Sequence, residues 1–168
     1  MSEPSITIWP ETADDAIAIE RLYERTFGPG RLAKTAYRIR EGAEHRLDLS
    51  FTARIGTLMI GSVRLTPVRI GTAKALLLGP LTVEPPFRER GIGQALIERA
   101  LADARAQGHR LVVLVGDEPY YKKAGFKRVP KGQVTLQGPV DPVRMLVAEL
   151  EEGAFAGVTG TVQPDWDA

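Results

Sequence analysis

The chain has 168 residues, of which 43% are hydrophobic and 26% are charged, and this length and composition are typical of one soluble globular domain. Its formal net charge of +1 gives no global field that would favour nucleic acid or a membrane surface, so any anion site has to be local. The absence of cysteine excludes disulfide frameworks, thiolate metal sites and cysteine nucleophiles.

The N-terminus and the apolar runs favour a cytoplasmic protein with no membrane partner. Residues 1–10 (MSEPSITIWP) lack the charged segment and apolar run of a signal peptide. The longest apolar run, residues 75–79, is far shorter than the roughly 20 residues that a membrane helix needs. The chain has two histidines, His45 and His109, which are too few for a zinc cluster, so we expect no metal.

The first part of the chain is predicted to contain strands and two helices. Alternation of apolar and polar residues predicts a short strand over residues 5–9. Helical spacing predicts a helix over residues 11–28, and a second helix follows over residues 30–42. Residues 47–55 and 58–70 lie on either side of a Gly-Thr turn and are predicted to form a hairpin.

The second part of the chain contains a predicted βαβ unit. Its two strands, residues 75–83 and 111–116, are apolar enough to be buried on both faces, and the helix over residues 91–107 has one apolar face. The remaining elements are a short helix in residues 118–126, strands over 126–129 and 143–148, and a loop-like tail over 153–168. This pattern predicts an α/β fold in which a mixed central sheet of about seven strands has helices on both faces.

A turn rich in glycine and arginine, residues 88–93 (RERGIG), precedes the long helix. The first N–H groups of a helix have no partner within it, and the helix dipole makes that end partially positive. Gly91 and Gly93 allow a ligand to approach the backbone, and Arg88 and Arg90 add charged donors. The turn therefore predicts a phosphate or diphosphate site. The alternative is a flexible loop with two solvated arginines.

Two neighbouring features support an anion site. Gly79-Pro80 interrupts the apolar strand, and because proline cannot donate to a ladder, we expect a bulge or splay that frees the backbone beyond it. The alternative is an edge strand. The run YYKKAGF (residues 120–126) places a phenol near the carboxyl ends of parallel strands, where α/β sheets bind ligands. The dinucleotide fingerprint is excluded because its third glycine falls on Leu96, and the chain has no G-K-[ST] sequence of a Walker A loop.

These segments resemble the GCN5-related N-acetyltransferase (GNAT) superfamily, and in particular a bacterial branch of predicted N-acetyltransferases. The R/Q-x-x-G-x-G/A loop of the family, which grips the diphosphate of acetyl-coenzyme A, is matched by Arg88, Gly91 and Gly93. The splayed strand of the family is matched by residues 79–83, and its Y-x-x-x-G-F motif by Tyr121, Gly125 and Phe126.

The resemblance covers residues 5–148 and is strongest over residues 76–129. It implies a GNAT-like splayed sheet and a GNAT domain over residues 1–150. A C-terminal tail, residues 151–168, would then pack on or near this domain.

The resemblance also implies a cosubstrate, acetyl-CoA, and a set of residues that binds it. That set consists of Leu81, Thr82, Val83, Arg88, Glu89, Arg90, Gly91, Ile92, Gly93, Gln94 and Tyr121. Tyr121 is the candidate acid for the leaving thiolate, and Glu84 and Asp117 are the candidate bases, acting through water. Either carboxylate could equally be a solvated or helix-capping group, and Tyr120 is expected to be a core or wall residue.

The implied activity is direct transfer of an acetyl group from acetyl-CoA to a primary amine, carried by a small molecule or a peptide. By analogy with the family, the acceptor walls would be residues 28–42, the turn at 56–58 and the late strands. An alternative is a non-catalytic acyl-CoA sensor on the same fold, and another is an interaction domain. A nucleic-acid partner is disfavoured by the near-neutral charge. The sequence leaves open whether the protein is a monomer or a homodimer.

Overall fold

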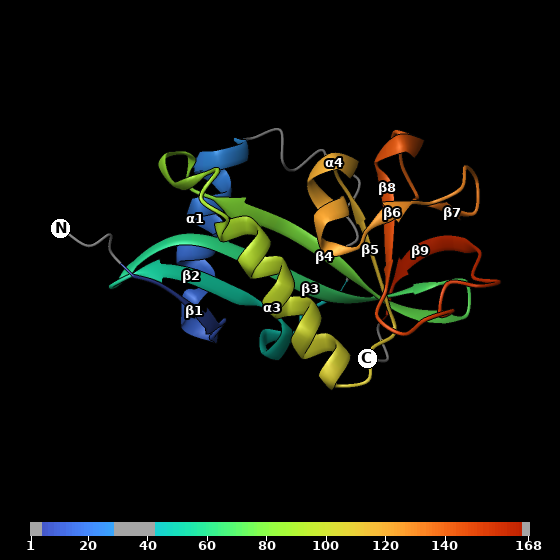
Figure 1. Cartoon of the computed structure of the whole chain (residues 1–168), viewed down its shortest axis with the longest axis horizontal. Helices are drawn as coiled ribbons and strands as arrows, with labels where there is room; N and C mark the ends of the chain where they lie inside the picture. The colour runs from blue at the N-terminus through green and yellow to red at the C-terminus, as the bar shows by residue number, and fades with distance from the viewer. Residues whose placement is uncertain (1–4, 29–42, 166–168) are drawn as a thin grey trace.

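The computed structural model describes residues 5–28 and 43–165, so the helix expected over residues 30–42 lies outside the described residues. Figure 1 shows a central sheet crossed by one long helix. The described strands are β1 Ile6–Pro10, β2 Phe51–Ile55, β3 Leu58–Ile70, β4 Ala73–Val83, β5 Leu111–Val115, β6 Lys127–Arg128, β7 Val134–Thr135, β8 Met145–Glu149 and β9 Gly160–Pro164. The described α-helices are α1 Ala16–Phe27, α3 Ile92–Ala106 and α4 Glu118–Tyr121.

The expected α/β class with a mixed sheet is confirmed. Seven strands follow one another in the order β1-β2-β3-β4-β5-β8-β6, and β9 joins β3 while β7 joins β9. Strands β4 and β5 run parallel, and the other neighbours along the main path are antiparallel. Helix α3 connects the two parallel strands along the chain, so β4-α3-β5 is the predicted βαβ unit.

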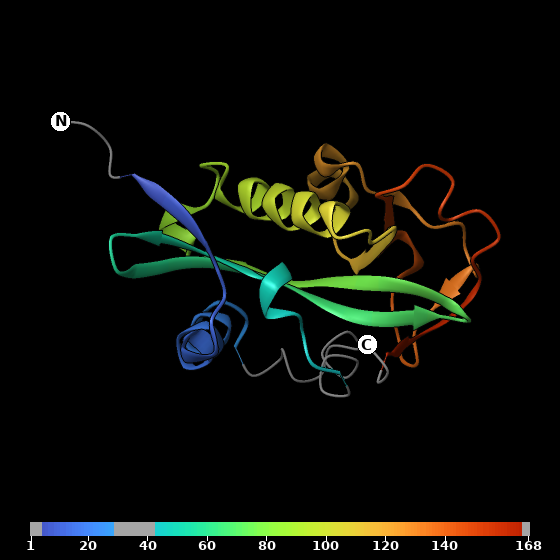
Figure 2. The same ribbon diagram turned by 90° about the horizontal axis from the view of Figure 1, so that it is seen from below.

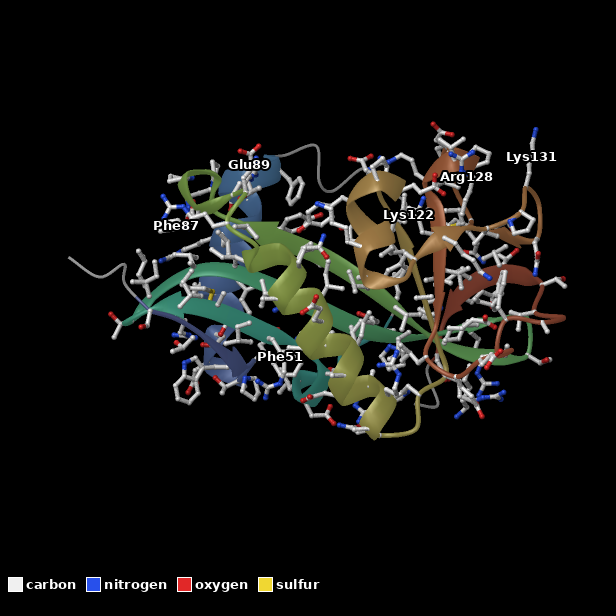
Figure 3. The ribbon with its side chains drawn as sticks, in the orientation of Figure 1. Phe51, Phe87, Glu89, Lys122, Arg128 and Lys131 are labelled. Carbon is white, nitrogen blue, oxygen red and sulfur yellow. The ribbon has the colours of Figure 1, made fainter. Side chains whose placement is uncertain are left out.

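The expectation of helices on both faces of the sheet is also confirmed (Figure 2). Helix α3 buries Leu96, Ile97 and Ala100 in the larger core cluster, and Phe51 of β2 lies in the same cluster (Figure 3). On the opposite face, α1 buries Ile19 and Leu22 against the sheet. Each helix therefore contributes one apolar face to the core, and the sheet between them is buried by both.

The expected splay lies in β4 and β5. Their ladder contains only Leu76 and Leu77 of β4, which pair with residues 112 and 113 of β5. Beyond this point β4 continues to Val83, while its other edge stays paired with β3 as far as Gly61. Among the described residues, the second half of β4 thus has one edge without a ladder partner, and this edge faces the gap toward β5.

Two expectations about secondary structure were wrong. The strand expected over residues 47–55 begins only at Phe51, because Leu47–Leu49 form a 3-10 turn whose carbonyl at Leu47 accepts the Ser50 N–H. The loop-like tail contains β9, which pairs with Val68–Ile70 of β3. Strand β2 pairs with β3 only as far as Val63. The tail therefore pairs with the part of this edge of β3 that β2 leaves free.

The C-terminal segment also contributes to the core. Phe155, Val158 and Val162 are buried in a second cluster, together with Val68 and Leu77 of the sheet. No helix within residues 5–28 and 43–165 is long and apolar enough to span a bilayer.

Candidate functional site

A cavity of about 980 Å³ opens where β4 and β5 separate. One side is formed by β4 and the first turn of α3, and the other by the end of β5 and by α4. The described residues around it include Leu81, Val83, Arg88, Glu89, Gly91, Ile92, Gly93, Gln94, Asp117 and Tyr121 from the sequence-based set. The splay of the sheet therefore creates the space in which these residues meet.

The N-terminus of α3 forms part of the wall of this site. Gly91 is the N-cap and has φ = 78°, a left-handed conformation that favours glycine. The first backbone bond of the helix runs from the Ala95 N–H to the Gly91 carbonyl, so the N–H groups of residues 92–94 have no partner within the helix. Glu89 also has a positive φ, 64°, although it is not glycine. Such strained backbone is typical of ligand-binding loops.

The two arginines of the turn point to different places. Arg88 lines the cavity, and its Nε donates to the Val83 carbonyl at 3.2 Å, which holds it beside the end of β4. Arg90 is not among the lining residues, and its guanidinium lies 5.5 Å from the centre of the Phe87 ring. Figure 3 shows Phe87 and Glu89 on the loop that precedes α3. The loop thus brings one arginine to the cavity.

The three β4 residues of the expected cofactor site do not all face the cavity. Leu81 and Val83 line the cavity, whereas Thr82 does not. Thr82 is buried opposite Ser62 of β3, and within the described part of the chain its hydroxyl has no hydrogen-bond partner. This follows from the alternation of strand side chains, which sends Thr82 to the opposite face of the sheet from its neighbours.

Tyr121 is held in the cavity by close packing. Its ring makes edge-to-face contacts with Tyr120, at 5.0 Å between ring centres, and with Phe126, at 5.9 Å. It also lies so close to Gly116, at the end of β5, that a Cβ there would overlap Cε2 of the ring. Burial, together with the nearby Tyr120 and Asp117, raises the pKa of Tyr121 to about 12. The phenol is therefore a neutral donor at physiological pH.

The two candidate carboxylates have different surroundings. The Glu84 Oε1 atom lies 2.5 Å from the Arg25 guanidinium of α1, and Glu84 is not among the residues around the cavity. Asp117 lines the cavity, and its side chain is 79% exposed with a loose contact of 3.5 Å to Arg144. Its backbone carbonyl, rather than its side chain, caps α4 by accepting the N–H groups of Tyr120 and Tyr121.

Metal ligands are not gathered in this part of the molecule. Within the described ranges, no group of three or more histidine, cysteine, aspartate or glutamate side chains is placed to hold a metal ion.

Comparison with known proteins places this geometry in a family. Residues 48–128 match the model of the acetyltransferase (GNAT) domain. The chain is 29% identical over 151 residues to the uncharacterized N-acetyltransferase YhbS of Escherichia coli strain K12, covering 89% of this chain and 90% of YhbS. It is 30% identical over 118 residues to the uncharacterized N-acetyltransferase CT2212 of Chlorobaculum tepidum, covering 70% of this chain and 72% of CT2212. The chain belongs to the GNAT superfamily.

Solved GNAT structures have the same fold. The crystal structure of Escherichia coli YhbS in complex with CoA has a TM-score of 0.82 at 26% identity and covers 98% of this chain and 93% of its own. A GNAT acetyltransferase of Brucella melitensis in complex with acetyl-CoA has a TM-score of 0.62 at 28% identity, covering 91% and 99%. The recognition of the family from the glycine loop, the splayed strand and the Y-x-x-x-G-F motif is therefore confirmed.

The GNAT cavity also contains residues that sequence reasoning did not assign. Tyr23, Thr26 and Phe27 of α1 border it, and so do residues 139–141 and Arg144 from the connection before β8. The turn at residues 56–58, an expected acceptor wall, is not among the lining residues, and residues 29–42 lie outside the described ranges. The sequence predicted the helix that carries the α1 residues, but only the tertiary fold shows that they border the cavity.

Proposed function

We propose that this GNAT protein transfers an acetyl group from acetyl-CoA directly to a primary amine on a small molecule or a peptide. The observation that carries the proposal is one continuous cavity that joins the free N–H groups of α3 to the Tyr121 phenol along the unpaired edge of β4. The solved complexes of YhbS with CoA and of the Brucella protein with acetyl-CoA support the choice of cosubstrate.

The residues present fit two parts of acetyl-CoA, the diphosphate and the pantetheine arm. The first turn of α3 offers backbone donors to a diphosphate, and the Arg88 guanidinium supplies a positive charge beside them. The free edge of β4 at Leu81 and Val83 offers backbone groups to the amides of the pantetheine arm, as in the addition of a strand to a sheet. The acetyl group would then lie near Tyr121.

The chemistry needs one acid and one proton acceptor. The amine nitrogen forms a bond to the carbonyl carbon, the carbon–sulfur bond breaks, and its electron pair goes to sulfur. Tyr121 donates its phenolic proton to that sulfur. Burial raises the pKa of the Tyr121 phenol to about 12, so the phenol keeps its proton until the thiolate forms beside it.

The proton lost by the amine leaves through Asp117. This carboxylate lines the cavity and is largely exposed, so it can accept a proton through water and return it to solvent. Glu84 is the weaker candidate because its carboxylate is paired with Arg25 outside the lining. We therefore assign the relay to Asp117 and a structural role to Glu84.

An amine panel tests this function. Purified protein is incubated with acetyl-CoA and each amine, and thiol release is followed. We expect release that depends on the amine for at least one acceptor class. Saturable binding of acetyl-CoA with no amine-dependent release across small amines, amino acids and peptides would contradict the proposal and favour a sensor.

A further inference from the structure

Tyr120 occupies the point at which the first turn of α3 meets α4. A Cβ on Gly93 would overlap the Tyr120 hydroxyl and would lie 3.3 Å from its Cζ atom. The same point is 3.7 Å from Cδ2 of Leu81 on the free half of β4. The hydroxyl therefore lies against the helix backbone where three parts of the site converge.

The position of Tyr120 is fixed by its neighbours. The Gln94 Nε2 atom of α3 donates to the Tyr120 carbonyl at 2.8 Å, which ties α4 to the first turn of α3. On its other side the Tyr120 ring contacts the Tyr121 ring edge to face. The backbone of Tyr120 is thus held by Gln94 and its ring by Tyr121, which keeps the hydroxyl beside the first turn of α3.

The hydroxyl is available as a donor. Among residues 5–28 and 43–165 it has no hydrogen-bond partner, and Tyr120 lines the cavity with 37% of its surface exposed. Burial raises the pKa of Tyr120, so the group keeps its proton at physiological pH. An unpaired phenolic donor beside the unpaired N–H groups of residues 92–94 extends the same anion-binding surface.

We propose that Tyr120 is a cofactor-positioning residue whose hydroxyl donates a hydrogen bond to the phosphate end of the phosphopantetheine arm. The inference rests on the cosubstrate assigned above. A ligand that runs from the edge of β4 to the N-terminus of α3 must pass the point shared by Leu81, Gly93 and Tyr120. The two adjacent tyrosines then have separate tasks, with Tyr120 at the phosphate and Tyr121 at the sulfur.

The first test compares two thioesters on Tyr120→Phe. Acetyl-CoA carries the diphosphate, and S-acetylpantetheine lacks every phosphate, so the hydroxyl should matter only for the former. We expect the Kd of acetyl-CoA to rise about tenfold, or roughly 1.4 kcal/mol. The Kd of S-acetylpantetheine and the melting temperature without ligand should stay the same. With an active amine, KM for acetyl-CoA should rise while kcat is retained.

A second variant tests whether the contact between the Tyr120 hydroxyl and Gly93 matters for binding. Gly93→Ala adds a Cβ where the hydroxyl lies, and because that atom is the end of a side chain, Tyr120 should move while the helix stays. Gly93→Ala should therefore weaken acetyl-CoA binding, and because it displaces the hydroxyl that Tyr120→Phe removes, the loss in the double variant should be smaller than the sum of the two single losses.

Three results would overturn the inference. These are unchanged or tighter acetyl-CoA binding by Tyr120→Phe, an equal loss for both thioesters, or a fall in kcat at unchanged affinity. The binding measurements need no acceptor, so they can be read even if no amine is acetylated. Failure of the proposed function is thereby separated from failure of this inference.

Discussion

The ring of Tyr121 packs directly over the backbone of Gly116, at the point where β5 ends and α4 begins. A Cβ on Gly116 would overlap the ring edge and would also lie 3.0 Å from Cδ1 of Leu114. The absence of a side chain at this position is thus what allows the phenol to sit inside the cavity. The family motif ends the same segment at Phe126, whose ring holds Tyr121 from the other side.

Gly116→Ala should therefore impair turnover by moving the acid. We expect kcat to fall at least about tenfold, equivalent to ~1.4 kcal/mol of barrier, while the Kd of acetyl-CoA changes little. Steady-state kinetics and calorimetric titration measure the two quantities. A variant with the parental kcat would show that the tightly packed position of Tyr121 is irrelevant to the chemistry.

Tyr121→Phe removes the proton and keeps the ring. The T-shaped contacts with Tyr120 and Phe126 should persist, so folding and acetyl-CoA affinity should barely change. Turnover should fall by a factor of about 10²–10⁴, which is the usual rate contribution of a positioned general acid. The loss should appear in kcat rather than in KM, because the proton is needed only as the thiolate leaves. Parental turnover would remove Tyr121 from the mechanism.

Asp117→Asn and Glu84→Gln distinguish the two carboxylates. Asp117→Asn should lower kcat and make it more dependent on pH and on added buffer, since solvent must then take the amine proton directly. Glu84→Gln should have the smaller kinetic effect and cost less than about 1 kcal/mol of stability, because its ion pair with Arg25 is exposed. The reverse order of kinetic effects would reassign the relay to Glu84.

The buried Glu11 carboxylate should make stability depend on pH. Burial alone would raise the pKa of Glu11, but hydrogen bonds from His45 and from Arg64 outweigh it and lower that pKa below 4.5. A group whose pKa is lower in the folded state stabilises the fold above its unfolded pKa and loses this contribution as pH falls through the folded value. The contribution of Glu11 should thus begin to fall near pH 4.5 and be lost as the pH drops through the lower folded pKa.

Glu11→Gln tests this by leaving Arg64 with a neutral partner. We expect a loss of about 3 kcal/mol in the free energy of unfolding at pH 7, the scale of a broken buried pair. In urea titrations the difference between parent and variant should narrow as the pH is lowered toward 3. A difference that is the same at both pH values would contradict the ionised state of Glu11.

Much of the fold was predictable because its signals are local. The apolar face of α3 and the two apolar strands around it are read within a short window of sequence, as are Gly91 and the Gly79-Pro80 interruption. Strand β9 was not predictable, because residues 160–164 become a strand only by pairing with β3, more than 90 residues away, and with β7. Its own sequence, GTVQP, carries little strand signal.

The candidate site was likewise predictable from the sequence only in part. The glycine loop and the Y-x-x-x-G-F run are readable from local sequence, and both segments contribute residues to the cavity lining. The path of the loop decides that Arg88 rather than Arg90 lines the cavity, and no spacing rule fixes that path. The pairing of Glu84 with Arg25 joins segments 59 residues apart, so it too emerges only from the tertiary fold.

The most direct test of the central claim is the stoichiometry of acetyl transfer with an amine that the panel identifies. Mass spectrometry of the acceptor and a thiol assay are run on the same reaction, with parent protein and with Tyr121→Phe. The account predicts one acetylated amine for each thiol released, and a large loss of both with the variant. Thiol release without acetylated amine, or equal rates for the two proteins, would contradict it.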